Sequence, residues 1–274
     1  MLIWGFLVSL LGALAGYYKQ ALSASGLVGA LLVGTVITGF GGWVWLAILA
    51  AFFLSASVLS GYRRRDKQGV EQDFAKTGRR DLGQVLANGG AGALVALINS
   101  LLGPDPHFFA LFIGTMATVN ADTWATELGV LSRGGTRSVL TGRRVAPGTS
   151  GGVSLAGTAA AAAGAALTGM VAEVGQLLTT PILPMSSVIL VSLVSGLVGC
   201  FADSFLGATV QIQYQCQVCG KVTEKTEHCH KLSRPTRGWP WVNNDLVNLL
   251  SSLIGGGTAV LLVYLLTSLN SAIL

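Results

Sequence analysis

The chain has 274 residues, of which 51% are hydrophobic and only 11% are charged, and its mean hydropathy is +0.64. A soluble domain usually carries about 25% charged residues, so this composition excludes an ordinary water-soluble protein and indicates a polytopic membrane protein. The net charge of +5 requires no nucleic-acid partner, because basic loops beside anionic lipid account for it.

Apolar stretches of roughly 17–25 residues, long enough to cross a bilayer, follow one another along the chain. We therefore predict an all-α bundle of about eight transmembrane helices in a single membrane domain that covers residues 1–274. The predicted spans are centred on residues 2–18, 24–40, 43–60, 83–102, 107–131, 152–178, 186–211 and 244–269.

The positions of Lys and Arg predict the orientation of this bundle. All 17 of these residues lie in four places, at Lys19 and in the segments 63–80, 133–144 and 221–237. These places are the loops after the first, third, fifth and seventh predicted spans, whereas the intervening loops contain no Lys or Arg. The positive-inside rule then puts the four basic loops in the cytoplasm and both termini on the non-cytoplasmic side.

The N-terminal segment is itself a predicted span, with neither an Arg- and Ser-rich transit segment nor a small-residue cleavage site. Targeting segments normally show one of these features. We therefore expect a bacterial membrane, or a chain from which a leader has already been removed.

Polar side chains interrupt four predicted spans near their cytoplasmic ends. A single intramembrane Asn or Asp can simply join two helices through a hydrogen bond worth about 1 kcal/mol. A set at one depth favours a functional site, because each buried acid costs several kcal/mol and needs a partner. The set comprises Asp81, Gln84 and Asn88 in the fourth span, Asn120, Asp122, Thr123 and Glu127 in the fifth, Asp203 in the seventh, and Asn244, Asp245 and Asn248 in the eighth.

The acids of this set are candidate metal ligands. Lys and Arg are absent from the predicted spans, so the partner of each acid is a basic loop or a metal ion, and oxygen ligands suit Mg²⁺. We predict Mg²⁺ at Asp122, Glu127, Asp203 and Asp245, with the first three as catalytic residues. On a regular helix Asp122 and Glu127 diverge by about 140°, which predicts different partners for the two unless the helix is irregular; either could also act as a general base.

A Gly-rich segment, "PGTSGG", leads from the third basic loop into the sixth predicted span. Glycines let successive backbone N–H groups turn inward, and a helix N-terminus adds partial positive charge, so this segment suits a phosphate group. The alternative is a plain helix cap, and the segment is not a Walker A loop, because the Lys-Ser/Thr ending is missing. Acids for Mg²⁺, an anion-binding loop and arginines together favour phosphoryl or nucleotidyl transfer. The expected phosphate-binding residues are Gly148, Thr149, Ser150, Gly151, Gly152, Arg79, Arg80, Arg143 and Arg144.

The loop between the last two predicted spans, residues 212–240, is rich in Cys and His. It contains Cys216 and Cys219 as C-x2-C, followed by His228 and Cys229 in an H-C-H sequence. A disulfide is not expected in the cytoplasm, and three thiols with one imidazole fit a structural Zn²⁺ site. We predict these four residues as the ligands and no catalytic role for the metal. Use of the second histidine instead, unligated thiols and an iron–sulfur site are the alternatives.

Several segments over residues 78–248 occur in a recognisable order: "GRRDLGQVLANGG", "NADTWATELG", "PGTSGGVSLAG", "CFADSFLGA", the Cys/His loop and "WVNNDLVN". They resemble the membrane family known as domain of unknown function 92, whose plant and cyanobacterial members include phytyl-phosphate kinase of tocopherol synthesis. The resemblance implies a membrane of the cyanobacterial type and phosphorylation of an isoprenoid monophosphate to the diphosphate, with CTP as donor. Carried over to this sequence, it implies a site at Asn88, Asn120, Asp122, Glu127, Asp203, Asn244, Asp245 and Asn248, with Gly148, Thr149, Ser150, Gly151 and Gly152 as the phosphate loop.

The leading hypothesis is a Mg²⁺-dependent kinase that phosphorylates phytyl or geranylgeranyl phosphate at the cytoplasmic face, with the lipid tail between helices. A CTP-dependent cytidylyltransferase that makes a CDP-lipid is the first alternative, because it would use the same metal and anion-binding groups. A membrane transporter is the second. A conduction path should place polar residues at several depths, whereas the outer halves of these spans are almost wholly apolar.

Overall fold

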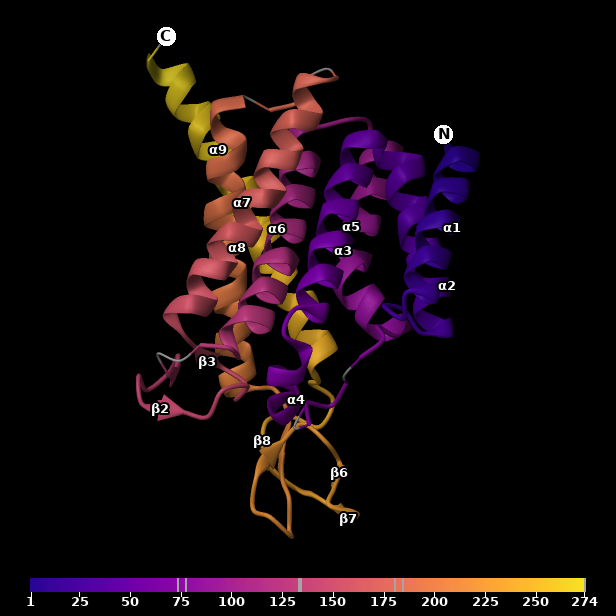
Figure 1. Ribbon diagram of the computed structural model, residues 1–274. Helices are drawn as coiled ribbons and strands as arrows, with labels where there is room; N and C mark the ends of the chain where they lie inside the picture. Colours follow the sequence, from indigo (N-terminus) through magenta and orange to yellow (C-terminus); the bar gives the residue numbers. More distant parts are fainter. Residues whose placement is uncertain (73, 77, 133–134, 180, 184, 274) are drawn as a thin grey trace.

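The chain folds into a bundle of long helices that carries short strands at one end (Figure 1). The computed structural model describes residues 1–72, 74–76, 78–132, 135–179, 181–183 and 185–273; Arg133, counted above among the basic residues, lies outside them. The helices are α1 (Leu2–Tyr18), α2 (Ala24–Val36) with its π-helical continuation η1 (Ile37–Gly41), α3 (Trp43–Gly61), α4 (Arg64–Glu71), α5 (Leu82–Leu102), α6 (Pro106–Gly129), α7 (Leu155–Leu177), α8 (Met185–Thr209) and α9 (Asn244–Ile273).

The long helices coincide with the predicted spans, and the prediction of a helical membrane bundle is confirmed. By length and composition, 6 helices among the described residues could cross a membrane. Helix α1 has 17 residues and is too short to be counted with them, and α6 is also not among them. The number of eight spans therefore stays a prediction. The six are Ala24–Gly41, Trp43–Gly61, Leu82–Leu102, Leu155–Leu177, Ser187–Thr209 and Asn244–Ser268.

Helix α6 is the centre of the bundle and contacts α3, α5, α7, α8 and α9. Its residues from Phe112 to Ala121 are all buried, as expected for a helix enclosed on every side. Small residues permit this packing: a side chain on Gly114 would meet the carbonyl of Gly255 in α9 at 2.6 Å. Since its neighbours shield α6 from lipid, it can carry polar residues that a lipid-facing helix cannot.

The strands lie in two of the basic loops between the predicted spans. One sheet has the order β2-β1-β3 and joins the two sides of the third basic loop, and all its pairings are antiparallel. The Cys/His loop contains a second sheet of order β5-β4-β8 and the hairpin β6-β7. The strands are β1 (Thr136–Ser138), β2 (Arg144–Val145), β3 (Gly152–Val153), β4 (Gln213–Gln215), β5 (Val222–Thr223), β6 (Glu227–His228), β7 (Lys231–Leu232) and β8 (Arg234–Arg237).

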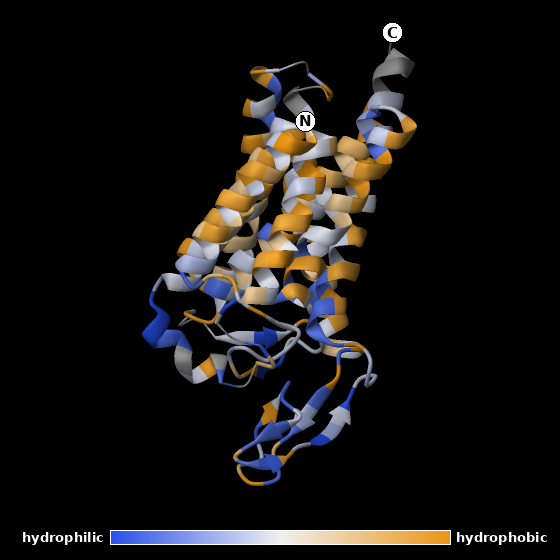
Figure 2. Ribbon diagram, turned by 90° about the vertical axis from the view of Figure 1, so that its right-hand side faces the viewer, coloured by the Kyte–Doolittle hydropathy of each residue, from blue (hydrophilic) through white to orange (hydrophobic). Residues whose placement is uncertain are grey.

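The two ends of the bundle differ in character. Both chain termini lie at one end, and α4, the β2 and β3 strands and the Cys/His loop lie at the other (Figure 1). Figure 2 shows that the helical bundle is mainly hydrophobic and that the end carrying the strands is mainly hydrophilic. The basic loops thus gather at one end, as the charge pattern predicts; which side of the membrane this end faces stays a prediction.

Candidate active site

A cavity of ≈ 530 Å³ opens at the strand end of the bundle. Helices α5, α6, α8 and α9 all contribute side chains to it, together with α4 and residues 148–152, hereafter the Gly-rich loop. Polar residues that the sequence placed at one depth on four helices therefore share one cavity. The predicted site residues that line it are Arg80, Gln84, Asn88, Asp122, Thr123, Glu127, Gly148, Thr149, Ser150, Gly151, Gly152, Asp203, Asn244, Asp245 and Asn248.

Five residues that the sequence placed at this site lie outside the lining: Arg79, Asp81, Asn120, Arg143 and Arg144. The three arginines are exposed. Asn120 is fully buried, and its amide donates to the carbonyl of Gly164 in α7 at 2.8 Å while its oxygen accepts from the Ser55 hydroxyl of α3 at 3.1 Å. Asn120 thus joins α6 to α3 and α7. This is the role of a helix-joining hydrogen bond, which was the alternative to a role in the site.

Asp122 of α6 and Asp203 of α8 both line the cavity, and their carboxylates are close enough for their charges to interact. Ser251 of α9 donates a hydrogen bond of 3.1 Å to Asp203. No ion pair within the described ranges involves either acid. Two like charges that share a cavity repel each other, and a divalent cation between them would remove this cost, so this pair fits Mg²⁺.

Glu127 has a different partner, because α6 is a regular helix through both acids. Its Oε2 atom lies 2.5 Å from Nζ of Lys67 on α4, and the Ser60 hydroxyl of α3 donates to its Oε1. Lys67 is only 1% exposed and also donates to the carbonyl of Leu59 at 2.7 Å. Both carboxylate oxygens of Glu127 are therefore already occupied by protein groups.

Asp245 is also paired with a lysine. Nζ of Lys76 lies 2.5 Å from Asp245 and 2.9 Å from Asp81. Burial opposes the charge of Lys76, but hydrogen bonds to Asp245 and Asp81 outweigh it and raise the pKa of Lys76. Burial likewise opposes the charge of Asp81, whose pKa is nevertheless lowered by the Gln84 backbone N–H and by Lys76.

The predicted four-acid metal site is thus divided. Among the described residues, the four acids do not bring three ligand atoms within 4.8 Å of one another. Two acids have lysine partners from the 63–80 block, and two do not. The geometry therefore narrows the Mg²⁺ proposal to Asp122 and Asp203.

The Gly-rich loop packs between α4 and α8. Gly148 and Gly151 have φ angles of +81° and +80°, a region that residues with a side chain rarely adopt. A Cβ atom on Gly151 would lie 2.3 Å from that of Ala208 in α8. The loop leads directly into α7, where the Ser154 hydroxyl accepts from the backbone N–H of Gly157 at 3.1 Å. Glycine is required here both for the turn and for the close approach.

Positive groups surround the cavity. The N-terminal residues of α5, α7 and α9 line it, and these helix ends carry partial positive charge. Arg80 lies in the lining, 5.9 Å from the centre of the Phe53 ring. Burial lowers the pKa of Arg80, and the charge of Glu127 opposes this shift. The helix ends and Arg80 suit a ligand that carries several phosphates, whereas Lys67 and Lys76 already have carboxylate partners.

Glu224, a half-buried residue of the Cys/His loop, also lines the cavity, and no sequence pattern indicates a role for it. Its carboxylate accepts from the Ser150 hydroxyl at 3.0 Å, from the Gln211 amide at 2.7 Å and from the backbone N–H of Ala75 at 3.2 Å. Lys67 and Lys76 were recognised only as members of a basic block. The hydropathy of loop residues does not indicate which side chains they contact, so the sequence contains no signal for the contacts of Glu224, Lys67 and Lys76.

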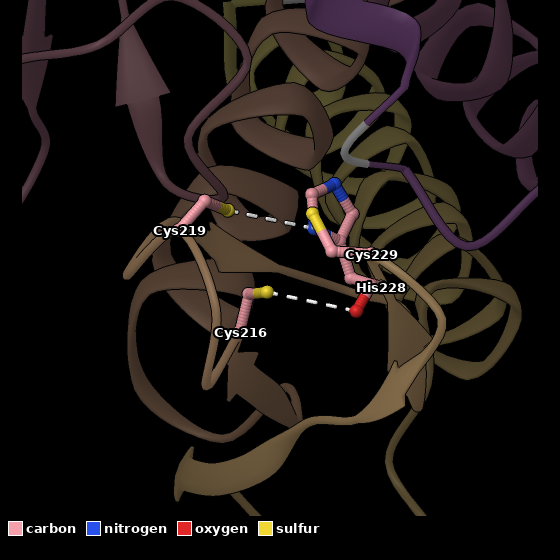
Figure 3. A group of neighbouring side chains, drawn as sticks. All are labelled: Cys216, Cys219, His228 and Cys229. Atoms are coloured by element: carbon pink, nitrogen blue, oxygen red, sulfur yellow. Dashed lines mark hydrogen bonds between the residues drawn. The ribbon is translucent and has the colours of Figure 1, made fainter.

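The Cys/His loop brings Cys216, Cys219, His228 and Cys229 together, with all four ligand atoms within 4.8 Å of one another (Figure 3). Nδ1 of His228 lies 3.6 Å from the sulfur of Cys219 and 3.2 Å from that of Cys229. Hydrogen bonds from the backbone N–H groups of Cys219 and Val218 lower the pKa of Cys216 to about 6, while burial and the neighbouring thiols raise the pKa of Cys229 to about 11. These are the four residues that the spacing predicted as metal ligands.

Comparison with known proteins gives consistent matches over most of the chain. Residues 7–256 match the family described as "Integral membrane protein DUF92". Protein PGR of Arabidopsis thaliana is 34% identical over 271 residues, which cover 92% of this chain and 93% of that protein. An uncharacterised membrane protein of Methanocaldococcus jannaschii is 28% identical, with 89% and 87% covered. The protein named "Protein VTE6, chloroplastic" of A. thaliana is 27% identical, with 88% and 65% covered. No solved structure matches the chain.

Proposed function

Because the chain belongs to the integral membrane protein family DUF92, we propose that it is a Mg²⁺-dependent kinase of isoprenoid monophosphates. In this reaction a nucleoside triphosphate, CTP by the family resemblance, donates its terminal phosphoryl group to phytyl or geranylgeranyl phosphate. The observation that carries the proposal is the pair Asp122 and Asp203, which lines the same cavity as the Gly-rich loop and several positive groups. This combination would suit a metal ion and the phosphates of two substrates at the end of a membrane bundle.

Each part of the cavity has a role in this reaction. Mg²⁺ held by Asp122 and Asp203 would neutralise charge that develops on the transferred phosphoryl group. The Gly-rich loop and the N-terminus of α7 would hold the phosphates of the donor. Arg80, Gln84 and Asn88 would orient the acceptor phosphate beside it. An oxygen of the acceptor phosphate attacks the terminal phosphorus, and the bond to the bridging oxygen of the nucleoside diphosphate breaks. An acceptor that is already an anion needs no strong general base.

The prenyl chain has an apolar part of the same cavity available. Ala161, Cys200 and Phe201 line it, and Phe201 is 42% exposed on α8. A chain that leaves the cavity here would pass into the surrounding lipid without crossing polar protein surface. The phosphate of the same substrate would stay among the charged groups, which suits an enzyme with an amphiphilic substrate.

The direct test is an assay of the purified protein in detergent. Four nucleoside triphosphates are each combined with Mg²⁺ and with farnesyl, geranylgeranyl or phytyl phosphate. We expect the prenyl diphosphate and a nucleoside diphosphate as products. Release of pyrophosphate together with a CDP-lipid would instead support the cytidylyltransferase. Flux of a prenyl phosphate into proteoliposomes without nucleotide, and no turnover in any combination, would contradict both enzymes.

The membrane environment is a further part of the proposal. The relatives come from a plant, an archaeon and a cyanobacterium, so they do not assign one membrane, and a bacterial membrane of the cyanobacterial type stays a prediction. The same holds for the position of the cavity at the cytoplasmic face, which depends on the positive-inside rule. Labelling of a cysteine introduced at the exposed Leu140 of the third basic loop by a membrane-impermeant reagent, in cells and in inverted vesicles, would assign the side once the labelled peptide is identified by mass spectrometry.

A further inference from the structure

The four-residue cluster of the Cys/His loop has the local geometry of two metal-binding turns. In the first turn, Gly220 has a φ angle of +73° and donates to the carbonyl of Cys216 at 3.1 Å, and the backbone N–H of Val218 points at the Cys216 sulfur at 3.3 Å. Such N–H groups stabilise a thiolate. The turn therefore presents Cys216 and Cys219 to one point.

The second turn is the tip of the hairpin β6-β7. His228 pairs with Lys231, so Cys229 and His230 form a two-residue connection, and both have positive φ angles of 52° and 58°. Two such angles in sequence define a type I′ turn, which normally uses Asn and Gly. Cys and His adopt it at a cost in backbone strain, and a bond from Cys229 to a metal would offset that cost.

The two turns are held opposite each other by further hydrogen bonds. The Gln217 amide of the first turn donates to the carbonyl of Leu232 after the second at 3.0 Å. The thiol of Cys216 in the first turn also donates to the carbonyl of His228 in the second at 3.6 Å. Three thiols and one imidazole at this separation match the composition of closed, tetrahedral Zn²⁺ sites.

The same segment contains Glu224, which lies between two members of the cluster, Cys219 and His228, in the sequence. Its carboxylate joins three separate parts of the cavity wall: Ser150 of the Gly-rich loop, Gln211 after α8 and Ala75 of the 63–80 block. The Gln213 amide adds a bond of 2.9 Å to the same Ser150 hydroxyl. Glu224 lies between Cys219 and His228, so an ion that binds these two residues would also hold Glu224 against the Gly-rich loop.

We propose that Cys216, Cys219, His228 and Cys229 bind one Zn²⁺, and that this ion holds Glu224 in place so that Glu224 positions the Gly-rich loop. Zn²⁺ replaces the protons of the three thiols and bonds to one imidazole nitrogen, with no change of oxidation state. Glu224 acts as a positioning residue through Ser150. The inference rests on the contacts of the Cys/His loop and not on the identity of the reaction.

The first measurement is the zinc content of the purified full-length protein by mass spectrometry of the metals. We expect one zinc per chain in the natural protein, and loss of it in Cys219→Ser and His228→Gln. His230→Gln and Cys200→Ser are the matched controls, because neither residue belongs to the cluster, and both variants should keep their zinc. Iron with sulfide in place of zinc, or chains that contain no metal while the cluster thiols react freely with a thiol reagent, would overturn the inference.

The second measurement is amide hydrogen exchange of the Gly-rich loop in the same variants. Exchange at residues 148–152 should accelerate roughly tenfold or more in Cys219→Ser and in Glu224→Ala, because hydrogen bonds to a charged group are lost. Glu224→Ala should keep its zinc, which separates positioning from metal binding. Glu227→Ala is the control, since Glu227 is an exposed acid of the same loop. Unchanged exchange after zinc is lost would overturn the positioning role.

Neither measurement needs a substrate, so the zinc site and the kinase reaction are tested independently. Zinc and a protected loop in a protein without kinase activity would contradict the proposed reaction and leave this inference standing. An active kinase without metal in the cluster would support the proposed reaction and contradict the zinc site.

Discussion

Nζ of Lys67 lies 2.5 Å from Oε2 of Glu127, and this ion pair joins helix α4 of a basic loop to the last turn of the central helix α6. Lys67 is 1% exposed and Glu127 is 19% exposed, so neither charge has much access to water. The pair turns one of the acids predicted as metal ligands into a structural connection between a loop and the bundle.

Lys67→Met should therefore destabilise the protein. Removing one partner of a buried pair leaves an uncompensated charge and costs about 3 kcal/mol. Thermal unfolding in detergent measures the effect, and the double variant Lys67→Met/Glu127→Gln should recover at least half of it. Arg63→Met is the control, because the Arg63–Asp66 pair has side chains that are 48% and 51% exposed and such pairs contribute at most about 1 kcal/mol. Equal losses in the single and double variants would contradict the pairing.

Asp122→Asn and Asp203→Asn should each lower kcat by about a hundredfold or more, because the charge that holds the metal is lost. They should also raise the Mg²⁺ concentration needed for half-maximal activity. Glu127→Gln should leave that concentration unchanged, since Glu127 already has protein partners. The check is a Mg²⁺ titration of the prenyl-phosphate kinase assay. A larger shift in Glu127→Gln than in Asp122→Asn would restore Glu127 as a ligand and contradict the narrowed site.

Gly151→Ala should impair donor binding more than it impairs folding. The added Cβ would lie 2.3 Å from that of Ala208 and would push the Gly-rich loop away from α8. The matched control is Gly142→Ala, which shares the positive φ angle but meets nothing within 4 Å. Backbone strain should cost each variant about 1 kcal/mol of stability, and the clash with Ala208 should add to this loss in Gly151→Ala. Only Gly151→Ala should raise the KM for the nucleotide. A similar KM in the two variants would contradict the role of close packing.

Stability should depend on pH through the Lys76–Asp81 contact at the start of α5. The pKa of Asp81 is lowered in the fold, so its contribution is complete above the usual carboxyl pKa of about 4 and is lost as the pH falls through the lowered value. The pKa of Lys76 is raised, so its contribution is complete below the usual lysine pKa of about 10 and is lost as the pH rises through the raised value.

The measurement compares the unfolding temperature of the natural protein with that of Lys76→Met over a pH range that extends below about 4 and above about 10. The difference should be constant from about pH 5 to about pH 9 and should shrink on both sides. It should be small, because Lys76 and Asp81 are 38% and 37% exposed and water screens the pair. A difference that keeps growing toward low pH would contradict the assignment.

The amino-acid sequence by itself determined the helical membrane bundle, the gathering of the basic loops at one end and the four cluster residues of the Cys/His loop. These features depend on local properties: hydropathy over a helix length, charge in the intervening loops, and the spacing of Cys and His within one short segment. The regular geometry of a helix also separated Asp122 from Glu127 before any contact was known. Each of these needs only residues that are close along the chain.

Only the tertiary structure decided which acids have protein partners and which do not. Lys67 reaches Glu127 across 60 positions, Lys76 reaches Asp245 across 169, and Ser150 reaches Glu224 across 74. The path of a loop and the rotation of a helix about its axis leave hydropathy unchanged, so the sequence pattern is the same whether such contacts form or not. The packing around α6 determines the loop paths and the helix rotation. As a result, Asn120 bonds to neighbouring helices, while Asp122 and Asp203 both line the cavity.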